Sequence, residues 1–227
     1  MGKKITLNTS NCFLYAKCQK EWWPAIDAAA KIIHVKKGQP VFKEGDDVTG
    51  IYFMIDGIVK VHREWDKERE LILRFASKTD ILGHRGLSSQ SAIYPVSATA
   101  LTNVTVCFID MHFFKSSLKV NPVFAYEMLM FFADELMLSE QNLKSLTVTN
   151  VKGRLAKLLV TLERKFGTNK EGYISFTISR QDMASSIGTV YETIYRLINE
   201  LLEEDLIFIE GKSVGIKNKK ALIALYA

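Results

Sequence analysis

Short apolar runs separated by turn residues occupy the chain from Ile32 to about Ile109. The runs read IIHV, PVF, IYFMI, IVKVH, LILRF, VSATAL and TVCFI. Glycines and acidic residues stand between them, as in KKG, KEGD and DG, and such residues favour tight turns. Because short strands with regular turn signals are typical of antiparallel sandwiches and barrels, the pattern predicts a β-rich first domain.

A long helical pattern follows from Asn121, with Pro122 at a tolerated first-turn position. One set of its heptad positions is leucine: Leu129, Leu136 and Leu143. The second set is weaker in its middle: Phe132, Ser139 and Leu146. Heptad spacing of this kind predicts the helix of a parallel homodimer. The alternative is that the seam packs against the protein's own β domain.

The last third of the chain has the pattern of a small domain with helices and a hairpin. The segment Val148–Val151 interrupts the long helix and is expected to act as a hinge. Lys152–Phe166 is amphipathic and is followed by Gly167, a residue suited to close a helix. YISFTI is expected to be a short strand, and LIFIEGKSVGIKN predicts two strands joined at Glu210-Gly211-Lys212.

The stretch SRQDMASSIGTVYETIYRL has the pattern of a helix-turn-helix. Ser179 is expected to cap the first helix. Ala184 allows two helices to cross closely, and Gly188 provides the positive φ of the turn between them. Ile194 and Leu197 are expected to face the interior of the domain. With the hairpin that follows, the pattern predicts a winged helix-turn-helix.

The opposite face of the second helix carries side chains that can contact bases: Tyr191, Glu192, Tyr195 and Arg196. Glu192 and Arg196 share one helical face. In a major groove, a glutamate can accept from cytosine N4 and an arginine can donate to guanine O6 and N7. The pattern therefore favours DNA reading. The alternative is a solvated ion pair between Glu192 and Arg196 on an ordinary helix.

Composition sets further limits. The 227 residues carry a net charge of +5, and Lys and Arg recur after Val148, as contacts with phosphates require. No run is long and apolar enough to span a membrane, and the sequence MGKKITLNTSNC lacks an apolar signal core. We therefore expect a cytoplasmic protein with no membrane partner, in which disulfides do not form. No nucleophile motif, phosphate loop or carboxylate pair indicates an enzyme.

A β-rich domain, a long helix and a winged helix-turn-helix, in that order, resemble the Crp/Fnr family of bacterial transcription regulators. The most specific stretches are KKGQPVFKEGDDVTGIYFMIDGIVKV and RQDMASSIGTVYETIYRLINELLEEDLI. The resemblance implies an α+β fold. Its expected parts are an antiparallel β-roll (a cyclic-nucleotide-binding-like jelly roll) at residues 1–120, a dimerisation helix at 121–148 and a winged helix-turn-helix at 149–227. It also implies a homodimer that binds palindromic double-stranded DNA and acts on RNA polymerase, under the control of an effector in the β-roll.

The resemblance also carries over the base-reading residues. Glu192 and Arg196 match the family's base-reading pair and together would read a G·C pair in a half-site resembling TGA. Tyr191 stands where the cyclic-AMP branch has another base-reading arginine, so the outer bases stay open. Tyr195 replaces a small residue of the family and would contact a thymine methyl or line the groove.

Four further residues are expected to hold the DNA backbone. Ser179, Arg180 and Thr189 match backbone-contacting positions of the family. Lys212, at the turn of the hairpin, can reach a phosphate. Such contacts fix the register of the protein on DNA without specifying sequence.

The expected effector pocket departs from the cyclic-nucleotide branch of the family. That branch carries Gly-Glu-Leu and, further along, Arg-Ser, which bind the ribose and the cyclic phosphate. Here those positions read Gly83-His84-Arg85 and Tyr94-Pro95, so cyclic AMP is not expected. Another ligand in the pocket of Gly83, His84, Arg85, Tyr94 and Ser97 remains open, with Arg85 as an anion partner. Haem on His84 and a pocket that no longer binds anything are further alternatives.

The cysteines suggest a second kind of trigger. The Fnr branch holds an oxygen-sensitive iron–sulfur cluster on three N-terminal cysteines and one in a late β-roll strand. Cys12, Cys18 and Cys107 match three of these ligands, and Thr9 stands in place of the remaining one. Thiolates suit iron–sulfur clusters, so such a cluster is a candidate cofactor. The alternative is that Cys107 fills an apolar strand and that the other two lie in a flexible tail.

Three functions follow from these patterns. The first is a homodimeric, sequence-specific DNA-binding regulator of transcription with a β-roll sensor. The second is a redox or small-molecule sensor that acts through a protein partner rather than DNA. The third is an enzyme that uses the barrel, which the lack of a clustered His/Glu metal set disfavours.

Overall fold

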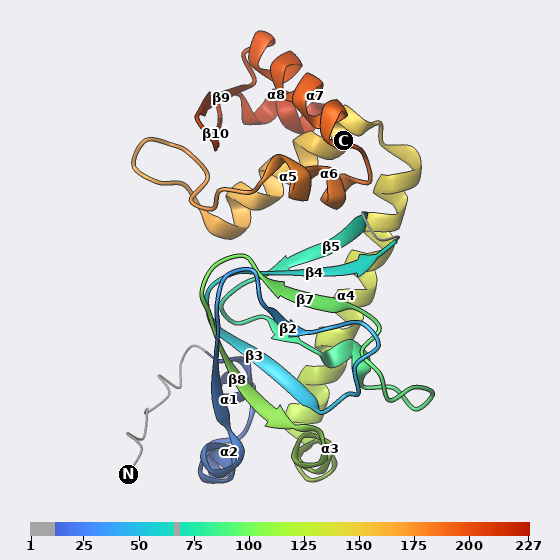
Figure 1. Ribbon diagram of the computed structural model, residues 1–227. Coiled ribbons are helices and arrows are strands. Elements are labelled where there is room, and N and C mark those ends of the chain that lie inside the picture. The colour runs from blue at the N-terminus through green and yellow to red at the C-terminus, as the bar shows by residue number, and fades with distance from the viewer. Residues whose placement is uncertain (1–11, 66–68) are drawn as a thin grey trace. The chain divides into compact units, whose positions relative to one another are not determined.

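The computed structural model describes residues 12–65 and 69–227. The chain divides into two compact units: one division falls inside a long helix, between Glu135 and Leu136, and the segment Glu64–Ile72 groups with the second unit. Figure 1 shows the β-rich first unit and the mainly helical second unit. The domain limits at residues 120 and 148 remain predictions.

The first unit contains two four-stranded sheets. One has the order β1-β8-β3-β6 and consists of β1 (Lys31–Val35), β8 (Val104–Asp110), β3 (Gly50–Asp56) and β6 (Ile81–Leu82). The other has the order β2-β7-β4-β5 and consists of β2 (Pro40–Phe42), β7 (Ser97–Ala100), β4 (Val59–Glu64) and β5 (Glu70–Ala76). Their described pairings are antiparallel, for example β1 with β8 and β4 with β7. This confirms the antiparallel β-rich domain that the apolar runs predicted.

Alternation along β3 places its side chains in two different cores. Tyr52 and Met54 belong to the core between the two sheets. Ile51 and Phe53 point to the other side, where they pack with residues of the surrounding helices. Successive side chains of a strand face opposite sides, so one central strand serves both cores.

Helices cover the second of these cores. They are α1 (Phe13–Lys17), α2 (Trp23–Ala29), α3 (Met111–Val120) and the start of α4 (Pro122–Val148), with a 3-10 turn, η2, at Lys20–Trp22. Two polar residues cap the later pair: Asp110 accepts from the backbone of α3, and Asn121 Oδ1 accepts from Phe124 N at 2.9 Å. Such caps satisfy amide groups that have no partner at a helix start.

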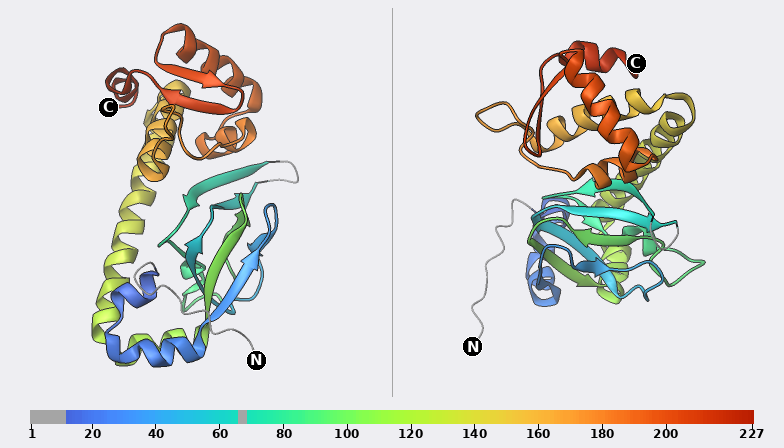
Figure 2. Two further views of the ribbon diagram at one scale, coloured as in Figure 1. Left: turned by 90° about the vertical axis from the view of Figure 1, so that its left-hand side faces the viewer. Right: turned by 45° about the horizontal axis from the view of Figure 1, so that its top comes forward.

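Helix α4 buries its beginning and exposes its leucine set. Phe124 and Met128 are buried in the first unit. Leu129, Leu136 and Leu143 are each more than 60% exposed, at 64%, 62% and 64%. Leu129, which belongs to the first unit, therefore does not pack against the β domain, whereas both alternatives for the seam as a whole stay predictions. Figure 2 follows α4 as one continuous helix.

One member of the weaker heptad set behaves differently from the leucines. Phe132 packs against the core of the first unit, and its ring meets that of His84 edge-on at 5.8 Å. The other two members of this set, Ser139 and Leu146, are exposed like the leucines, so only Phe132 departs from the free stripe.

The second unit has the elements of a winged helix-turn-helix. They are α5 (Val151–Phe166), α6 (Arg180–Ile187), α7 (Tyr191–Glu203), β9 (Ile207–Glu210), β10 (Ser213–Ile216) and α8 (Lys219–Ala224). β9 and β10 form the expected antiparallel hairpin. The sequence patterns did not indicate α1, α3 or α8.

The expected strand YISFTI is not formed. Only isolated bridges occur there, between Tyr173 and Gly215 and between Ile174 and Thr168. The chain bends after Ile174, and Ser175 N donates to Gly167 O at 3.0 Å instead of continuing along β10. The apolar residues of the segment are used for burial, as Ile174 and Ile178 show.

Candidate DNA-reading helix and effector pocket

The turn between α6 and α7 has the geometry that the sequence predicted. Ser179 caps α6, because its Oγ accepts from Asp182 N at 3.0 Å. Gly188 closes α6 in the left-handed region, at φ 66° and ψ 54°. Ala184 is 1% exposed, where α6 packs against α7. A glycine adopts this backbone conformation without steric cost, so the turn depends on local sequence.

Helix α7 is divided into a buried face and an exposed face. Ile194 and Leu197 are buried, as expected. Tyr191 and Tyr195 are 47% and 61% exposed, and Glu192 and Arg196 are exposed beside them. The four predicted base-reading side chains therefore share one open surface.

Arg196 makes an ion pair with Glu200, one turn further along α7. The sequence analysis considered an ion pair between Glu192 and Arg196. In the structure, Arg196 pairs with Glu200 instead. An exposed pair of this kind contributes little to stability. Arg196 is therefore available to another partner at small cost.

The predicted backbone-contacting residues lie around the same helices. Arg180 is half-buried, with Nη1 3.5 Å from Met183 Sδ, and burial lowers its pKa. Thr189 lies in the turn, where its N–H donates to Ala184 O at 3.1 Å. Lys212 is exposed next to Gly211 at the hairpin turn. These positions leave the side chains of Ser179 and Lys212 open to solvent.

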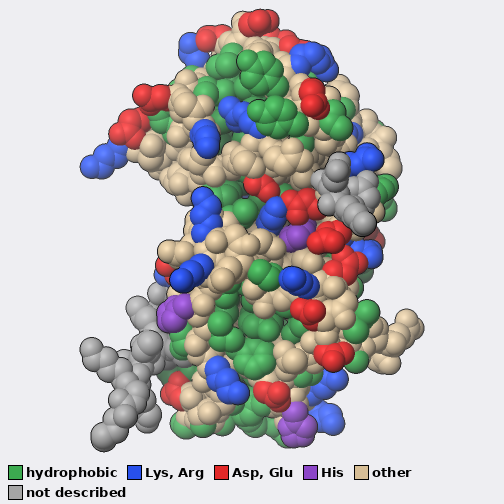
Figure 3. All heavy atoms as spheres, viewed as in Figure 1, with side chains coloured by type: hydrophobic (Ala, Val, Ile, Leu, Met, Phe, Trp, Pro, Cys, Tyr) green, Lys and Arg blue, Asp and Glu red, His purple; other side chains and the backbone are tan. Residues whose placement is uncertain are grey.

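Several basic residues of the second unit have structural partners. Lys152 contacts Glu204 at 2.5 Å, Lys217 contacts Asp205 at 2.6 Å, and Lys219 pairs with Glu163. The face drawn in Figure 3 likewise shows Lys and Arg interspersed with Asp and Glu. Basic composition alone therefore overstates the charge available to phosphates.

Arg154 of α5 has a role that the sequence analysis missed. Its Nε donates to Ile187 O at 2.8 Å, and its Nη1 donates to Thr149 O at 2.9 Å and to Leu146 O at 3.3 Å. It thus satisfies carbonyls at the ends of two helices, α6 and α4. Its position in an amphipathic helix resembled that of a solvated arginine, so no local signal distinguished it.

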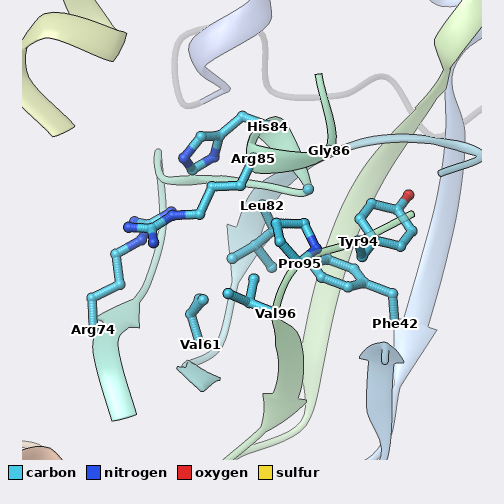
Figure 4. Close-up of a pocket in the computed structure, with 11 residues that line it drawn as sticks. Phe42, Val61, Arg74, Leu82, His84, Arg85, Gly86, Tyr94, Pro95 and Val96 are labelled. Carbon is cyan, nitrogen blue, oxygen red and sulfur yellow. The ribbon is translucent and has the colours of Figure 1, made fainter. Parts of the chain in front are cut away.

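The candidate effector pocket lies in the first unit, beside the 3-10 turn η3 (His84–Gly86). Its cavity measures about 10 Å³, the space that one water molecule needs. Figure 4 shows its lining: Phe42, Val61, Arg74, Leu82, Gly83, His84, Arg85, Gly86, Tyr94, Pro95 and Val96. Gly83 starts the turn at φ 81°, a conformation that favours glycine.

The pocket residues predicted from the sequence divide into two groups. Gly83, His84, Arg85 and Tyr94 line the cavity, whereas Ser97 does not. Ser97 Oγ instead accepts from Glu44 N at 2.9 Å. The hydroxyl of Tyr94 donates to Gly50 O at 2.8 Å, so Tyr94 offers the cavity its ring.

An ionic cluster that the sequence did not reveal adjoins this pocket. Glu135 of α4 places its Oε2 3.4 Å from His84 Nε2, 3.5 Å from Arg85 Nη2 and 3.6 Å from Arg74 Nε. The Glu135 side chain is 14% exposed. The only sequence signal was a charged residue, Arg74, inside the apolar run LILRF.

The cluster shifts the protonation of its members. Burial alone raises the pKa of Glu135, but contact with His84 and attraction by Arg74 and Arg85 outweigh it and hold the pKa at about 2. Burial lowers the pKa of His84, and the opposing effect of Glu135 does not reverse this shift. Glu135 is therefore ionised at neutral pH, and His84 is neutral there.

The three cysteines are buried together rather than placed in a tail. Cys12, Cys18 and Cys107 are free thiols in the core beneath α1, with 2%, 8% and 0% exposure. A hydrogen bond between the thiols of Cys12 and Cys107 lowers the pKa of Cys12 and, together with burial, raises that of Cys107. Burial raises the pKa of Cys18 to about 12.

This arrangement does not fit a bound iron–sulfur cluster, which needs several thiolates around one open space. Among residues 12–65 and 69–227, no group of three or more His, Cys, Asp or Glu side chains is placed to hold a metal ion. Thr9 lies outside the described residues. The described cysteines, as they pack, thus do not support the iron–sulfur site that the resemblance implied.

Comparisons with known proteins agree with this architecture. Residues 32–121 match the family model of the cyclic nucleotide-binding domain, and residues 153–225 match that of the Crp-like helix-turn-helix domain. The fold and these matches define a DNA-binding transcription regulator with an effector-type β domain. The chain belongs to the Crp/Fnr family of bacterial transcription regulators.

Individual relatives show the same relationship. The chain is 29% identical over 188 residues to the CRP-like cAMP-activated global transcriptional regulator of Mycobacterium tuberculosis, covering 82% of this chain and 84% of that protein. It is 27% identical over 193 residues to the fumarate and nitrate reduction regulatory protein of Salmonella typhimurium, covering 84% and 76%. FixK2 from Bradyrhizobium japonicum superposes with a TM-score of 0.78 at 20% identity, covering 87% of this chain and 98% of that structure.

These relatives are transcription regulators, and so is this protein; regulators of the family bind DNA and act as dimers. Within the described part of the chain, no helix is both long and apolar enough to cross a bilayer.

Proposed function

We propose that the protein is a homodimeric regulator that reads a palindromic DNA site through the exposed face of α7. The observation that carries this proposal is the division of α7 into the buried Ile194 and Leu197 and an open face with Glu192 and Arg196. A helix that buries one face in its domain can present the other to a major groove. Each subunit of the dimer then reads one half-site.

Glu192 and Arg196 are the proposed base-reading residues. Arg196 leaves the exposed carboxylate of Glu200 and donates to a guanine, while Glu192 accepts from a cytosine. Together they read a G·C pair of a TGA-like half-site. Tyr191 and Tyr195 line the groove beside them and supply apolar contacts, for example with a thymine methyl.

Backbone contacts are proposed for residues around this helix. Ser179, Arg180 and Thr189 contact phosphates near the turn, and Lys212 contacts a phosphate from the wing. The N-terminus of α7 supports this placement, because Val190 provides no side-chain cap for its amide groups. Free amides at a helix start attract anions.

The dimer contact is proposed along α4. Leu129, Leu136 and Leu143 form an exposed stripe of one heptad set, and a second copy of the helix would bury it. RNA polymerase, on which regulators of this family act, is the proposed protein partner. The first unit is the proposed sensor, and the cavity beside η3 is its effector site.

Selection of binding sequences from a random DNA pool tests the reading function. We expect a palindrome with TGA-like half-sites. Arg196→Ala should weaken binding to this site by about 1–3 kcal/mol and leave binding to random DNA largely unchanged, as fluorescence anisotropy would measure.

Arg164→Ala is the matched control, because Arg164 is an exposed arginine on a different helix, α5. The assignment of Arg196 is wrong if both variants keep the full preference for the selected site. Failure to select any palindrome would favour a sensor that acts through a protein partner.

A further inference from the structure

Three basic side chains share a single carboxylate oxygen in the first unit. Arg74 of β5 and His84 and Arg85 of η3 all place a nitrogen 3.4–3.6 Å from Glu135 Oε2. Ordinary charge-assisted hydrogen bonds between such groups are about 2.7–2.9 Å long. The three distances to this one oxygen are thus all longer than the usual length of such a hydrogen bond.

Buried donor atoms of this cluster are also left without hydrogen bonds. Among the residues that the structure describes, His84 Nδ1 and Nε2 and Arg74 Nε have no hydrogen-bond partner, and one of the two nitrogens of the neutral His84 is a donor, as is Arg74 Nε. His84 is 3% exposed, and its contact with Glu135 lacks hydrogen-bond geometry. A buried donor without an acceptor is unfavourable, so this cluster can accommodate a further acceptor.

The cluster forms one wall of the cavity beside η3. Arg74, His84 and Arg85 line it on one side, and apolar side chains such as Val61 and Val96 line it on the other. In Figure 4 the ends of Arg74 and Arg85 extend to the same region, next to His84. A cavity of about 10 Å³ has no room for a carboxylate or phosphate group, so such a group enters only if a neighbouring side chain moves. Glu135 does not line the cavity, but it contacts Arg74, His84 and Arg85, which do.

We propose that Arg74, His84 and Arg85 bind the anionic group of a small effector, a carboxylate or a phosphate, and that Glu135 occupies this site as an internal counter-ion until the effector displaces it. The inference deepens the proposed sensor function and rests on it. The exchange keeps an anion beside the two arginines. Apolar lining on the opposite wall would receive the body of the effector.

Displacement of Glu135 would free this part of α4 from η3. Glu135 holds α4 to Arg74 and Arg85 through ion pairs, and both arginines come from the β domain. When the effector binds to the two arginines, α4 loses its ion pairs with them. The signal would therefore enter α4 at Glu135, on the helix that also carries the exposed leucines.

Inorganic phosphate is the first probe, used with the full-length protein at constant ionic strength in chloride. Glu135→Gln removes the internal competitor and should bind phosphate at least ten-fold more tightly than the wild type. The readout is the rise of the thermal unfolding midpoint with phosphate concentration. Adding Arg85→Gln to that variant should abolish the rise.

The matched control is Glu140→Gln, an exposed carboxylate of the same helix, which should bind phosphate as the wild type does. Acetate in a second series distinguishes the two anionic groups, and binding of neither overturns the proposal. Equal phosphate affinity of Glu135→Gln and the wild type also overturns it, as does binding that survives Arg85→Gln.

Two measurements protect the test against a variant that does not fold. Glu135→Asp shortens the side chain by one carbon and should show an intermediate gain in affinity. In the wild type, saturating phosphate should increase amide hydrogen exchange in α4 around Glu135, and unchanged exchange contradicts the proposal. DNA binding is measured separately without phosphate, so its loss would count against the proposed function and not against the anion site.

Discussion

Glu135 of α4 and His84 of η3 meet with Oε2 and Nε2 3.4 Å apart. Phe131 and Phe132, also on α4, pack their rings edge-on against the His84 imidazole at 4.9 and 5.8 Å. The pocket turn and the long helix are thus joined by both polar and apolar contacts. A substitution or displacement of either residue is therefore expected to change the position of the other.

Acid should weaken the first unit through Glu135. Its pKa lies at about 2 in the folded state and 4.5 as a free side chain, so its stabilising effect is complete above pH 4.5 and is lost as the pH falls toward 2. At about 1.4 kcal/mol per pH unit, the loss is on the order of 3 kcal/mol. Urea unfolding of the wild type and Glu135→Gln between pH 2 and 5 measures it.

His84 needs its own comparison in that experiment. Burial lowers the pKa of His84. The protein's free energy of unfolding therefore also decreases through His84 as the pH falls below 6.5, the ordinary pKa of a histidine. His84→Asn, measured beside Glu135→Gln, separates the two contributions. An unfolding free energy of Glu135→Gln that falls between pH 4.5 and 2 as steeply as in the wild type would show that Glu135 does not carry this dependence.

Leu136→Glu should weaken dimerisation. Leu136 is 62% exposed in the middle of the leucine set of α4, and a charge at the centre of a dimer seam is unfavourable. We expect the dimer dissociation constant to rise at least ten-fold, as sedimentation equilibrium would measure. Leu138→Glu is the control, because Leu138 is 47% exposed but outside the heptad sets. Equal effects of the two changes would place the dimer contact elsewhere.

Arg154→Ala should destabilise the helix-turn-helix unit by about 1–3 kcal/mol, because three carbonyl groups lose a charged donor. Chemical unfolding followed by circular dichroism measures the change. Arg164→Ala, an exposed arginine of the same helix, should alter stability by less than about 0.5 kcal/mol. A similar loss in both would mean that the carbonyl contacts contribute nothing specific.

Gly188→Ala should cost about 1–2 kcal/mol of stability. The cost comes from backbone strain at φ 66°, since the nearest atom to an added Cβ, Leu146 Cδ2, lies at an ordinary 3.5 Å. Gly188→Asn should cost less, because asparagine tolerates this region better. If asparagine is as costly as alanine in the same unfolding assay, the strain explanation fails.

Anaerobically purified protein should contain no stoichiometric iron or sulfide. The free thiols of Cys12 and Cys107 are hydrogen-bonded to each other in an apolar core, where they act as small buried side chains. Iron and sulfide assays with a visible spectrum decide the matter. A brown absorbance that is lost in air and absent from Cys107→Ala would instead establish the cluster implied by the family resemblance.

The sequence by itself determined the features of this protein that depend on residues close together along the chain. The Ser179 cap, the Gly188 turn and the buried and exposed faces of α7 each follow from side chains within a few turns of helix, so their spacing was sufficient. The leucine set of α4 was visible for the same reason. The strand expected at YISFTI was wrong because Ile174 N donates to Val214 O but Ser175 N donates to Gly167 O, so the segment does not follow one partner strand.

Only the tertiary structure decided the arrangements that join distant elements. Arg74, His84 and Glu135 come from a strand, a turn and a helix, and no spacing rule relates their positions. Packing also turned Phe132 toward the core while Leu129, Leu136 and Leu143 remained exposed, and it buried the three cysteines together. Burial and pKa depend on every side chain around a group, so they are properties of the folded chain rather than of its local sequence.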